Sequence, residues 1–256
     1  MASPLSLLRV PVRLFGLAAL TIYHTTRIIL GGHLSPDNLR RWGRRISGLV
    51  GLELEVSGPL PERGGLLIAN HRSYTDIPVL MALCPSRFLS KAEVRRWPII
   101  GWAAAKAGTI FVRRDRAESR RAARRRLRAL LDEGAYVIVF PEGTTTPQGT
   151  LASLRPGMFR EAVEAQLPIT LAAIEYERAE AAWTSEESFL THFMRVFRRR
   201  RQRVQISFSE SILAEEGEDA EALQGRCERW LREQIASLSG VSGLAPEPAK
   251  IFDAQA

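Results

Sequence analysis

Short apolar runs alternate with longer amphipathic segments along most of this chain. The runs that predict strands cover residues 52–56, 66–69, 87–91, 109–112, 136–140, 169–176 and 204–209. The segments that predict helices begin near residues 76 and 95, or cover residues 117–133, 157–166, 185–198 and 219–238. Strands that alternate with helices are typical of α/β proteins. We therefore expect a three-layer domain whose mostly parallel or mixed central sheet is flanked by helices.

Residues 5–30 are largely apolar, but Arg9, Arg13 and His24 interrupt the run. Its cleanest part, residues 14–23, is too short to cross a hydrocarbon core of about 30 Å. A helix or helix pair lying in the membrane interface fits this pattern best. A helix packed on the soluble core and a single tilted span are the alternatives. No small-residue cleavage site follows the run, so we expect no cleaved signal peptide.

A change of pattern near residue 48 divides the sequence. We expect a membrane-associating helical segment over residues 1–47 and a globular α/β domain over residues 48–238. The remaining residues, 239–256, are rich in Gly, Pro and Ala and predict a disordered tail. A chain of 256 residues is long enough for one sizeable domain and short for two.

The chain is basic, with 36 Lys and Arg against 28 Asp and Glu and a net charge of +8. Such a surface attracts nucleic acid, anionic lipid or anionic substrates. No nucleic-acid motif is present, and aromatic residues are not interleaved with the arginine clusters at 120–128 and 198–203, so we expect no nucleic-acid partner. The two cysteines and four histidines lack metal-ligand spacing, so we expect no metal site.

A polar turn with one histidine and one aspartate follows the predicted strand 66–69. A predicted helix starts at its end, where Ser73 or Thr75 is the expected cap. The turn brings Asp76 toward the ring of His71, and a carboxylate on one ring nitrogen leaves the other free to take a proton. His71 is therefore a candidate general base oriented by Asp76. A histidine that only bonds a loop has the same spacing.

Two further polar turns follow the predicted strands 109–112 and 136–140. They carry Arg114, Glu142, Gly143 and Thr144. Ligands of α/β proteins bind at the carboxyl ends of strands, where these turns lie. In this order, and with Pro168-Ile169 ahead of another predicted strand, the four blocks resemble the glycerolipid acyltransferase family. That family includes the 1-acylglycerol-3-phosphate acyltransferases.

The resemblance implies transfer of a fatty acyl group from acyl-CoA or acyl-carrier protein to the free hydroxyl of 1-acylglycerol-3-phosphate, in phospholipid biosynthesis. It implies that His71, held by Asp76, acts directly as the general base, without an acyl-enzyme and without a cofactor. The Gly-x-Ser-x-Gly pattern of a nucleophilic serine is absent, so Ser73 keeps its expected role as a cap.

The resemblance also assigns the other polar residues. Arg114 matches the second-block arginine associated with acceptor binding, and a surface ion pair with Asp115 or Glu118 is the alternative. Glu142, Gly143 and Thr144 match the third block. Glu142 either bonds acceptor hydroxyls or anchors its loop, and both roles stay open.

The chain departs from the family at two positions. Thr145 stands where many lysophosphatidate enzymes have an arginine, and Leu171 follows where a second proline is frequent. The downstream pattern is similar to that of lyso-ornithine lipid acyltransferases. It comprises Glu175, Tyr176, Trp183, Phe189, Leu190 and His192. Lyso-ornithine lipid is therefore the alternative acceptor.

The expected location is the cytoplasmic face of a bacterial inner membrane, with membrane lipid as partner and CoA or carrier protein as the donor's carrier. Basic residues favour anionic lipid at that face. Two other functions compete with acyl transfer to a lysolipid. One is a non-catalytic basic binder of nucleic acid or membrane, and the other is a thioesterase-like hydrolase in which water replaces the acceptor.

Overall fold

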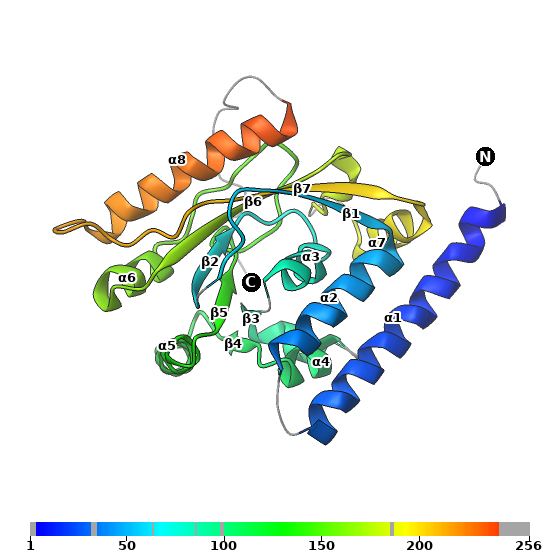
Figure 1. The fold of residues 1–256 in the computed structure, drawn as a ribbon, viewed down its shortest axis with the longest axis horizontal. Coiled ribbons are helices and arrows are strands. Elements are labelled where there is room, and N and C mark those ends of the chain that lie inside the picture. Colours follow the sequence, from blue (N-terminus) through cyan, green and yellow to red (C-terminus); the bar gives the residue numbers. More distant parts are fainter. Residues whose placement is uncertain are drawn as a thin grey trace.

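The computed structural model describes residues 4–31, 35–62, 64–84, 86–97, 100–184 and 187–240 (Figure 1). The helices are α1 (Pro4–Gly31), α2 (Pro36–Val50), α3 (Asp76–Leu83), α4 (Ile100–Lys106), α5 (Ala117–Asp132), α6 (Gly157–Ala165), α7 (Phe189–Arg198) and α8 (Ala220–Ser239), with the 3-10 turns η1 (Ala92–Arg96) and η2 (Ala179–Ala181). The strands are β1 (Leu52–Ser57), β2 (Gly65–Ala69), β3 (Ser86–Lys91), β4 (Ile110–Val112), β5 (Tyr136–Val139), β6 (Ile169–Tyr176) and β7 (Gln202–Phe208).

The strands form one sheet in the order β1-β7-β6-β2-β5-β3-β4. Neighbouring strands are parallel except for β6 and β7, which are antiparallel. The central strands β2, β5 and β6 are buried along their whole length, as is usual for parallel strands that helices cover on both faces. The predicted α/β fold with a mostly parallel sheet is confirmed.

Helices cover both faces of this sheet and enclose a separate apolar core on each side. Residues of α2, α3 and α7, such as Val79 and Phe197, pack with Ile174 on one face. On the other face residues of α5, α6 and α8, such as Phe159 and Leu231, pack with Ala173. Figure 1 shows α6 and α8 on one side and α2, α3 and α7 on the other. Ala173 and Ile174 serve opposite cores because side chains alternate along a strand.

The first helix, α1, packs against α2, α4 and α7 with its polar residues turned inward. Its buried side chains include Arg13, Thr21, His24 and Thr25. Its exposed side chains include Leu8, Val12, Phe15, Ile22 and Leu30. This arrangement inverts the usual amphipathic pattern of a helix on a water-soluble core. None of the helices described here is long and apolar enough to cross a membrane.

Arg13 fixes α1 to the turn that leads from α7 into β7. Its guanidinium donates hydrogen bonds to the carbonyl oxygens of Phe197 at 3.0 Å and Arg200 at 3.1 Å, and also to that of Arg199. Burial lowers the pKa of Arg13, and the charge of Arg9 adds to the effect. These bonds satisfy carbonyl groups in the last turn of α7 and just beyond it, where a helix supplies no partner of its own.

Several predicted boundaries differ from the structure. The helix predicted from residue 185 begins at Phe189, because Ser188 caps it by accepting the backbone N–H of Thr191, and residues 185 and 186 lie outside the described residues. The helix predicted from residue 95 starts only at Ile100, after the turn η1.

The predicted segment boundaries can be compared with the helices near them. α2 crosses residue 48 and ends where Gly51 adopts a left-handed conformation (φ +83°). The predicted tail from residue 241 onward lies outside the described residues. The division into segments at residues 47 and 238 stays a prediction.

Candidate active site

The turn between β2 and α3 is organised by the carboxylate of Asp76. Its Oδ2 atom lies 2.8 Å from Nδ1 of His71 and accepts the backbone N–H groups of Arg72 at 2.7 Å and Ser73 at 2.9 Å. The Asp76 side chain is fully buried. A short acidic side chain can satisfy the donors of its own turn in this way, which explains why the chain curls tightly here. The predicted meeting of His71 and Asp76 is confirmed.

The predicted cap of α3 by Ser73 or Thr75 is wrong. Thr75 occupies the N-cap position, but its side chain makes no capping bond and lies 2.7 Å from the hydroxyl of Tyr176 instead. Ser73 accepts only the N–H of Thr75, at 3.4 Å within the turn. The first N–H groups of α3 need no side-chain cap, because those of Asp76, Ile77 and Val79 donate to backbone carbonyl groups of residues 73–75 and Pro78 has none.

The His71 ring is held between Asp76 and an aromatic side chain. Phe140 stacks on it with ring centroids 4.0 Å apart and planes 14° apart. The His71 side chain is 19% exposed, whereas Asp76 is closed to solvent. Because Nδ1 is engaged by Asp76, Nε2 is the nitrogen left to exchange a proton.

Glu142 ties the third predicted block to the His71 turn. Its carboxylate accepts the backbone N–H of His71 at 2.7 Å through one oxygen and that of Ala152 at 2.8 Å through the other. Burial raises the pKa of this carboxyl, and the charge of Arg72 opposes the rise. Of the two roles left open, the structure shows the loop anchor, since both oxygens are engaged by backbone groups.

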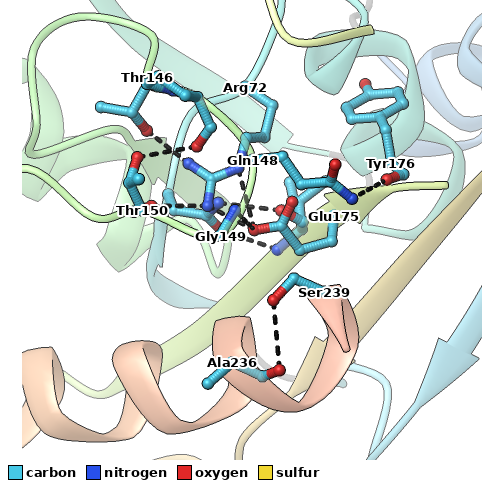
Figure 2. A network of polar contacts seen from close by, with 12 residues as sticks. Arg72, Thr146, Gln148, Gly149, Thr150, Glu175, Tyr176, Ala236 and Ser239 are labelled. Carbon is cyan, nitrogen blue, oxygen red and sulfur yellow. Dashed lines mark hydrogen bonds and ion pairs between the residues drawn. The ribbon is translucent and has the colours of Figure 1, made fainter. Parts of the chain in front are cut away.

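Arg72, which the sequence did not single out, is the centre of a buried polar network (Figure 2). Its guanidinium donates to Glu175 from Nε at 3.1 Å, to the carbonyl of Thr150 at 2.7 Å and to the hydroxyl of Thr146. The backbone N–H of Gly149 also donates to Glu175, at 3.1 Å. The network therefore fixes the loop after β5 against the end of β6.

Two arginines meet beside Gly143, and Lys91 is close enough to interact electrostatically with both. A Cβ atom at Gly143 would come within 2.7 Å of Arg114 Nη1 and of Arg155 Nε, and its φ of +74° also favours glycine. Burial and the charge of Arg155 lower the pKa of Arg114, and burial and both arginines lower that of Lys91. Nη1 of Arg114 is buried without a hydrogen-bond partner in the described structure. This arrangement is suited to an anion.

The alternative ion pair of Arg114 is not formed within the described residues. Asp115 lies 3.8 Å from Arg113 instead, and neither Asp115 nor Glu118 pairs with Arg114. The sequence analysis missed Lys91 and Arg155 as neighbours of Arg114. The sequence could have indicated Lys91, because it lies at the end of a predicted strand, where ligands of α/β proteins bind. Arg155 lies in a loop, and no sequence pattern marks it.

Thr144 is exposed on the loop after β5, and Thr145 bonds a distant segment. The Thr145 hydroxyl donates to the carbonyl of Trp183. Trp183 packs against Tyr74 of the His71 turn with ring centroids 6.0 Å apart, and His192 packs against Tyr74 at 5.5 Å. The downstream pattern noted in the sequence thus lies beside the His71 turn.

His192 is a buried histidine of this aromatic group. Its Nε2 lies 3.1 Å from the carbonyl of Ala181 and its Nδ1 lies 3.2 Å from the Tyr74 hydroxyl. Burial lowers its pKa, and the charge of Arg195 adds to this. Across the parts of the chain with described coordinates, no group of three or more His, Cys, Asp or Glu side chains could hold a metal ion.

Comparison with known proteins identifies the family. A family model described as Acyltransferase matches residues 52–175. A lyso-ornithine lipid O-acyltransferase of Pseudomonas aeruginosa is 39% identical over 221 residues, which cover 81% of this chain and 85% of that protein. The chain belongs to the glycerolipid acyltransferase family. The predicted resemblance is confirmed, and the turns of His71, Arg114 and Glu142 all lie in the matched region of this acyltransferase.

Two further relatives extend the comparison of the acyltransferase. A 1-acyl-sn-glycerol-3-phosphate acyltransferase of Neisseria meningitidis is 29% identical over 201 residues, which cover 76% of this chain and 79% of that protein. The crystal structure of the 1-acyl-sn-glycerophosphate (LPA) acyltransferase PlsC from Thermotoga maritima aligns with a TM-score of 0.64 at 20% identity, covering 92% of this chain and 99% of that one. The two proteins share the fold.

Proposed function

We propose that this acyltransferase moves a fatty acyl group from an acyl thioester, carried by CoA or acyl-carrier protein, to the free hydroxyl of a lysolipid. The observation that carries the proposal is the hydrogen bond of 2.8 Å between Asp76 and Nδ1 of His71. It leaves Nε2 of a partly exposed ring to act as the base, which an alcohol needs because it is a poor nucleophile at neutral pH.

In the proposed reaction the acceptor hydroxyl gives its proton to Nε2 of His71 as its oxygen attacks the thioester carbonyl. A new C–O bond forms, and the C–S bond breaks when the tetrahedral intermediate collapses. The departing thiolate takes the proton from the imidazolium, so no charge remains on His71. Asp76 keeps the ring in the required tautomer and stabilises the imidazolium while it exists.

The group of Lys91, Arg114 and Arg155 is the proposed site for an acidic group of the acceptor. An anion there would give the buried Nη1 of Arg114 a partner and would offset the mutual repulsion of the three cations. Phosphate and carboxylate both match the donor fork of an arginine. A lysophosphatidate supplies the phosphate, and the headgroup of lyso-ornithine lipid supplies a carboxylate.

Between these acceptors, the position of Thr145 favours lyso-ornithine lipid. Many lysophosphatidate enzymes of the family have an arginine at that position, whereas here the Thr145 hydroxyl binds the carbonyl of Trp183 and adds no charge. The lyso-ornithine lipid O-acyltransferase of Pseudomonas aeruginosa also shares 39% of aligned residues, against 29% for the Neisseria enzyme. 1-Acylglycerol-3-phosphate, the acceptor expected from the four blocks, is the second candidate.

The proposal includes residence of α1 in the interface of a membrane, at its cytoplasmic face. The exposed apolar side chains of α1, such as Phe15 and Ile22, support this, because its polar side chains already have partners inside the protein. An interfacial helix buries one apolar face at the boundary of headgroups and acyl chains. The lysolipid acceptor lies in the same layer.

The test uses purified enzyme in mixed micelles with labelled acyl-CoA or acyl-carrier protein and three acceptors: lyso-ornithine lipid, 1-acylglycerol-3-phosphate and lysophosphatidylcholine. We expect faster transfer to lyso-ornithine lipid, and a fall in kcat of about 10²–10⁴-fold for His71→Ala, since that is the usual contribution of a general base. The kcat of Asp76→Asn should fall by a similar factor, because an asparagine favours the wrong tautomer of His71.

Thermal unfolding must show that both variants are folded. A folded His71→Ala variant with substantial activity would contradict the mechanism. Free fatty acid released at the same rate with and without acceptor would instead indicate a hydrolase. Transfer to 1-acylglycerol-3-phosphate alone would support acyl transfer to a lysolipid but contradict the proposed preference for lyso-ornithine lipid.

A further inference from the structure

We propose that Tyr176, at the end of β6, is a positioning residue of the His71–Asp76 pair, and that Thr75 completes it as a hydrogen-bonded chain. The effect on rate rests on the proposed function, whereas the effect on the His71–Asp76 bond does not. The sequence marked Tyr176 only as part of a downstream pattern. Its side chain is a hundred residues away from the aspartate that it reaches.

The geometry around Asp76 carries the proposal. The Tyr176 hydroxyl donates to Oδ1 of Asp76 at 2.7 Å, while Oδ2 accepts from His71 and from two backbone N–H groups. Both carboxylate oxygens are therefore held, and the plane of the carboxylate is fixed relative to the imidazole. Without Tyr176, the bonds on Oδ2 alone would leave the carboxylate free to rotate about them.

The direction of each hydrogen bond follows from the donors available. An ionised carboxylate only accepts, so the single proton of the Tyr176 hydroxyl is directed at Asp76. The Thr75 hydroxyl, 2.7 Å from the Tyr176 oxygen, must then donate to it. The chain runs from Thr75 through Tyr176 and Asp76 to His71. A hydroxyl that accepts a hydrogen bond becomes a better donor, so Thr75 strengthens the bond from Tyr176 to Asp76.

Tyr176 remains a proton donor at every working pH. Burial raises the pKa of its hydroxyl well above the usual value, and the charge of Asp76 adds to the rise. The side chain is almost completely buried, in the core next to α3. A neutral donor of this kind holds a carboxylate without neutralising it, unlike a cation, so Asp76 keeps the charge that it presents to His71.

Strand β6 reaches the His71 turn from both faces of the sheet. Tyr176 binds Asp76 on the face covered by α3, and its neighbour Glu175 binds Arg72 on the opposite side of the strand. Successive side chains of a strand point to opposite faces, so two adjacent residues can grip both sides of one turn. Glu175 holds the Arg72 side chain of the turn, and Tyr176 fixes the orientation of its aspartate.

The experiment compares Tyr176→Phe with Tyr136→Phe. Tyr136 is a matched control, because it is a buried tyrosine at the start of β5, whereas Tyr176 lies at the end of β6, and β2 separates these two strands. For Tyr176→Phe we expect kcat to fall by about tenfold or more, the scale of a lost hydrogen bond to a charged group, with little change in KM. Tyr136→Phe should keep the wild-type rate.

Two readouts separate positioning from mere support of the fold. The carboxylate of Tyr176→Phe, short of one donor, attracts the imidazolium proton more strongly, so the acid limb of the kcat/KM profile should move to higher pH. Proton NMR should also show a shifted downfield resonance for the Nδ1–H of His71. This second readout needs no substrate, so it tests the proposal even if wild-type enzyme acylates none of the acceptors, an outcome that would count against the proposed function alone.

A folded Tyr176→Phe enzyme with wild-type kcat, pH profile and Nδ1–H resonance would overturn the proposal. If Tyr176→Phe does not fold, Thr75→Val takes its place, because it removes only the first donor of the chain. We then expect about a threefold fall in kcat with a pH shift in the same direction. An unchanged rate, profile and resonance in folded Thr75→Val would overturn the chain.

Discussion

At the scale of single residues, the pairing of Arg72 with Glu175 explains how a charged side chain can be fully buried beside His71, the proposed general base. Both side chains are closed to solvent, and the guanidinium also donates to two groups besides Glu175, the Thr146 hydroxyl and the Thr150 carbonyl. Burying two charges brings little net stability, but removing one partner leaves the other charge unpaired in a medium of low polarity.

Arg72→Met should therefore lower the free energy of unfolding by about 3–5 kcal/mol. The double variant Arg72→Met/Glu175→Leu should regain at least half of this loss, because no unpaired charge remains. Thermal or urea unfolding of both variants and of Glu175→Leu gives the coupling energy. Equal stability of the single and double variants would show that the ion pair does not determine the loss.

The deficit of Arg72→Met should also depend on pH. Burial already raises the pKa of Glu175, and the loss of Arg72, which opposes the rise, raises it further. The folded state then binds more protons than the unfolded chain above the usual pKa of about 4.3, so the free energy of unfolding falls as pH rises through this window. The same unfolding series at about pH 5 and about pH 8 should show the smaller deficit at the lower pH.

At the scale of elements, α2 is placed close enough to α3 to support the start of α3, where Asp76 lies. A glycine permits this approach. A Cβ atom at Gly43 would lie 2.5 Å from the backbone nitrogen of Ala82 and 2.7 Å from the carbonyl oxygen of Pro78. Gly48, five residues later on the same helix, faces open space. The two glycines therefore test packing and helix propensity separately.

Gly43→Ala should destabilise the protein by about 1–3 kcal/mol and reduce activity, because α2 must move away from α3 to admit the methyl group. Gly48→Ala should instead stabilise it by about 0.5–1 kcal/mol, since alanine favours a helix interior over glycine. Unfolding midpoints of both variants check the contrast. Similar effects of the two changes would mean that α2 and α3 are not packed as closely as described.

At the scale of the whole molecule, two helices that pack against α1 also carry exposed apolar side chains. α1 packs against α4 and α7, and these carry the exposed side chains of Trp102 and Leu190. If α1 lies in the interface as proposed, these side chains lie near the same boundary. Apolar contact rather than charge should then dominate the affinity for membranes.

Replacing Phe15 and Ile22 together by Glu should weaken binding to lipid vesicles by about tenfold or more per residue, since burying such a side chain is worth about 1.5–3 kcal/mol. Co-sedimentation with vesicles at low and high salt measures the effect. Leu213→Glu is the matched control, because Leu213 is similarly exposed but lies between β7 and α8. Wild-type partitioning of the α1 variant would contradict an interfacial role for this helix.

Local parts of this architecture could be predicted from the sequence, and its long-range pairings could not. Local patterns predict local structure directly. Examples are the apolar residues of β5 and β6 and the five-residue spacing of His71 and Asp76. The bond from Tyr176 to Asp76 and the approach of Arg155 to Arg114 depend on which strands become neighbours. The insertion of β7 between β1 and β6 was not predictable either, because an apolar run does not specify its partner.

That insertion also governs how a nascent chain can mature. β1 emerges from the ribosome long before its neighbour β7, which separates it from the rest of the sheet. Until Phe208 has emerged, β1 is an unpaired edge of the kind that invites aggregation. The helix α1 and the His71 turn are therefore synthesised well before α7 and β6, which hold them. A stop codon ahead of Phe208 would leave a chain with its His71–Asp76 turn complete and its sheet open.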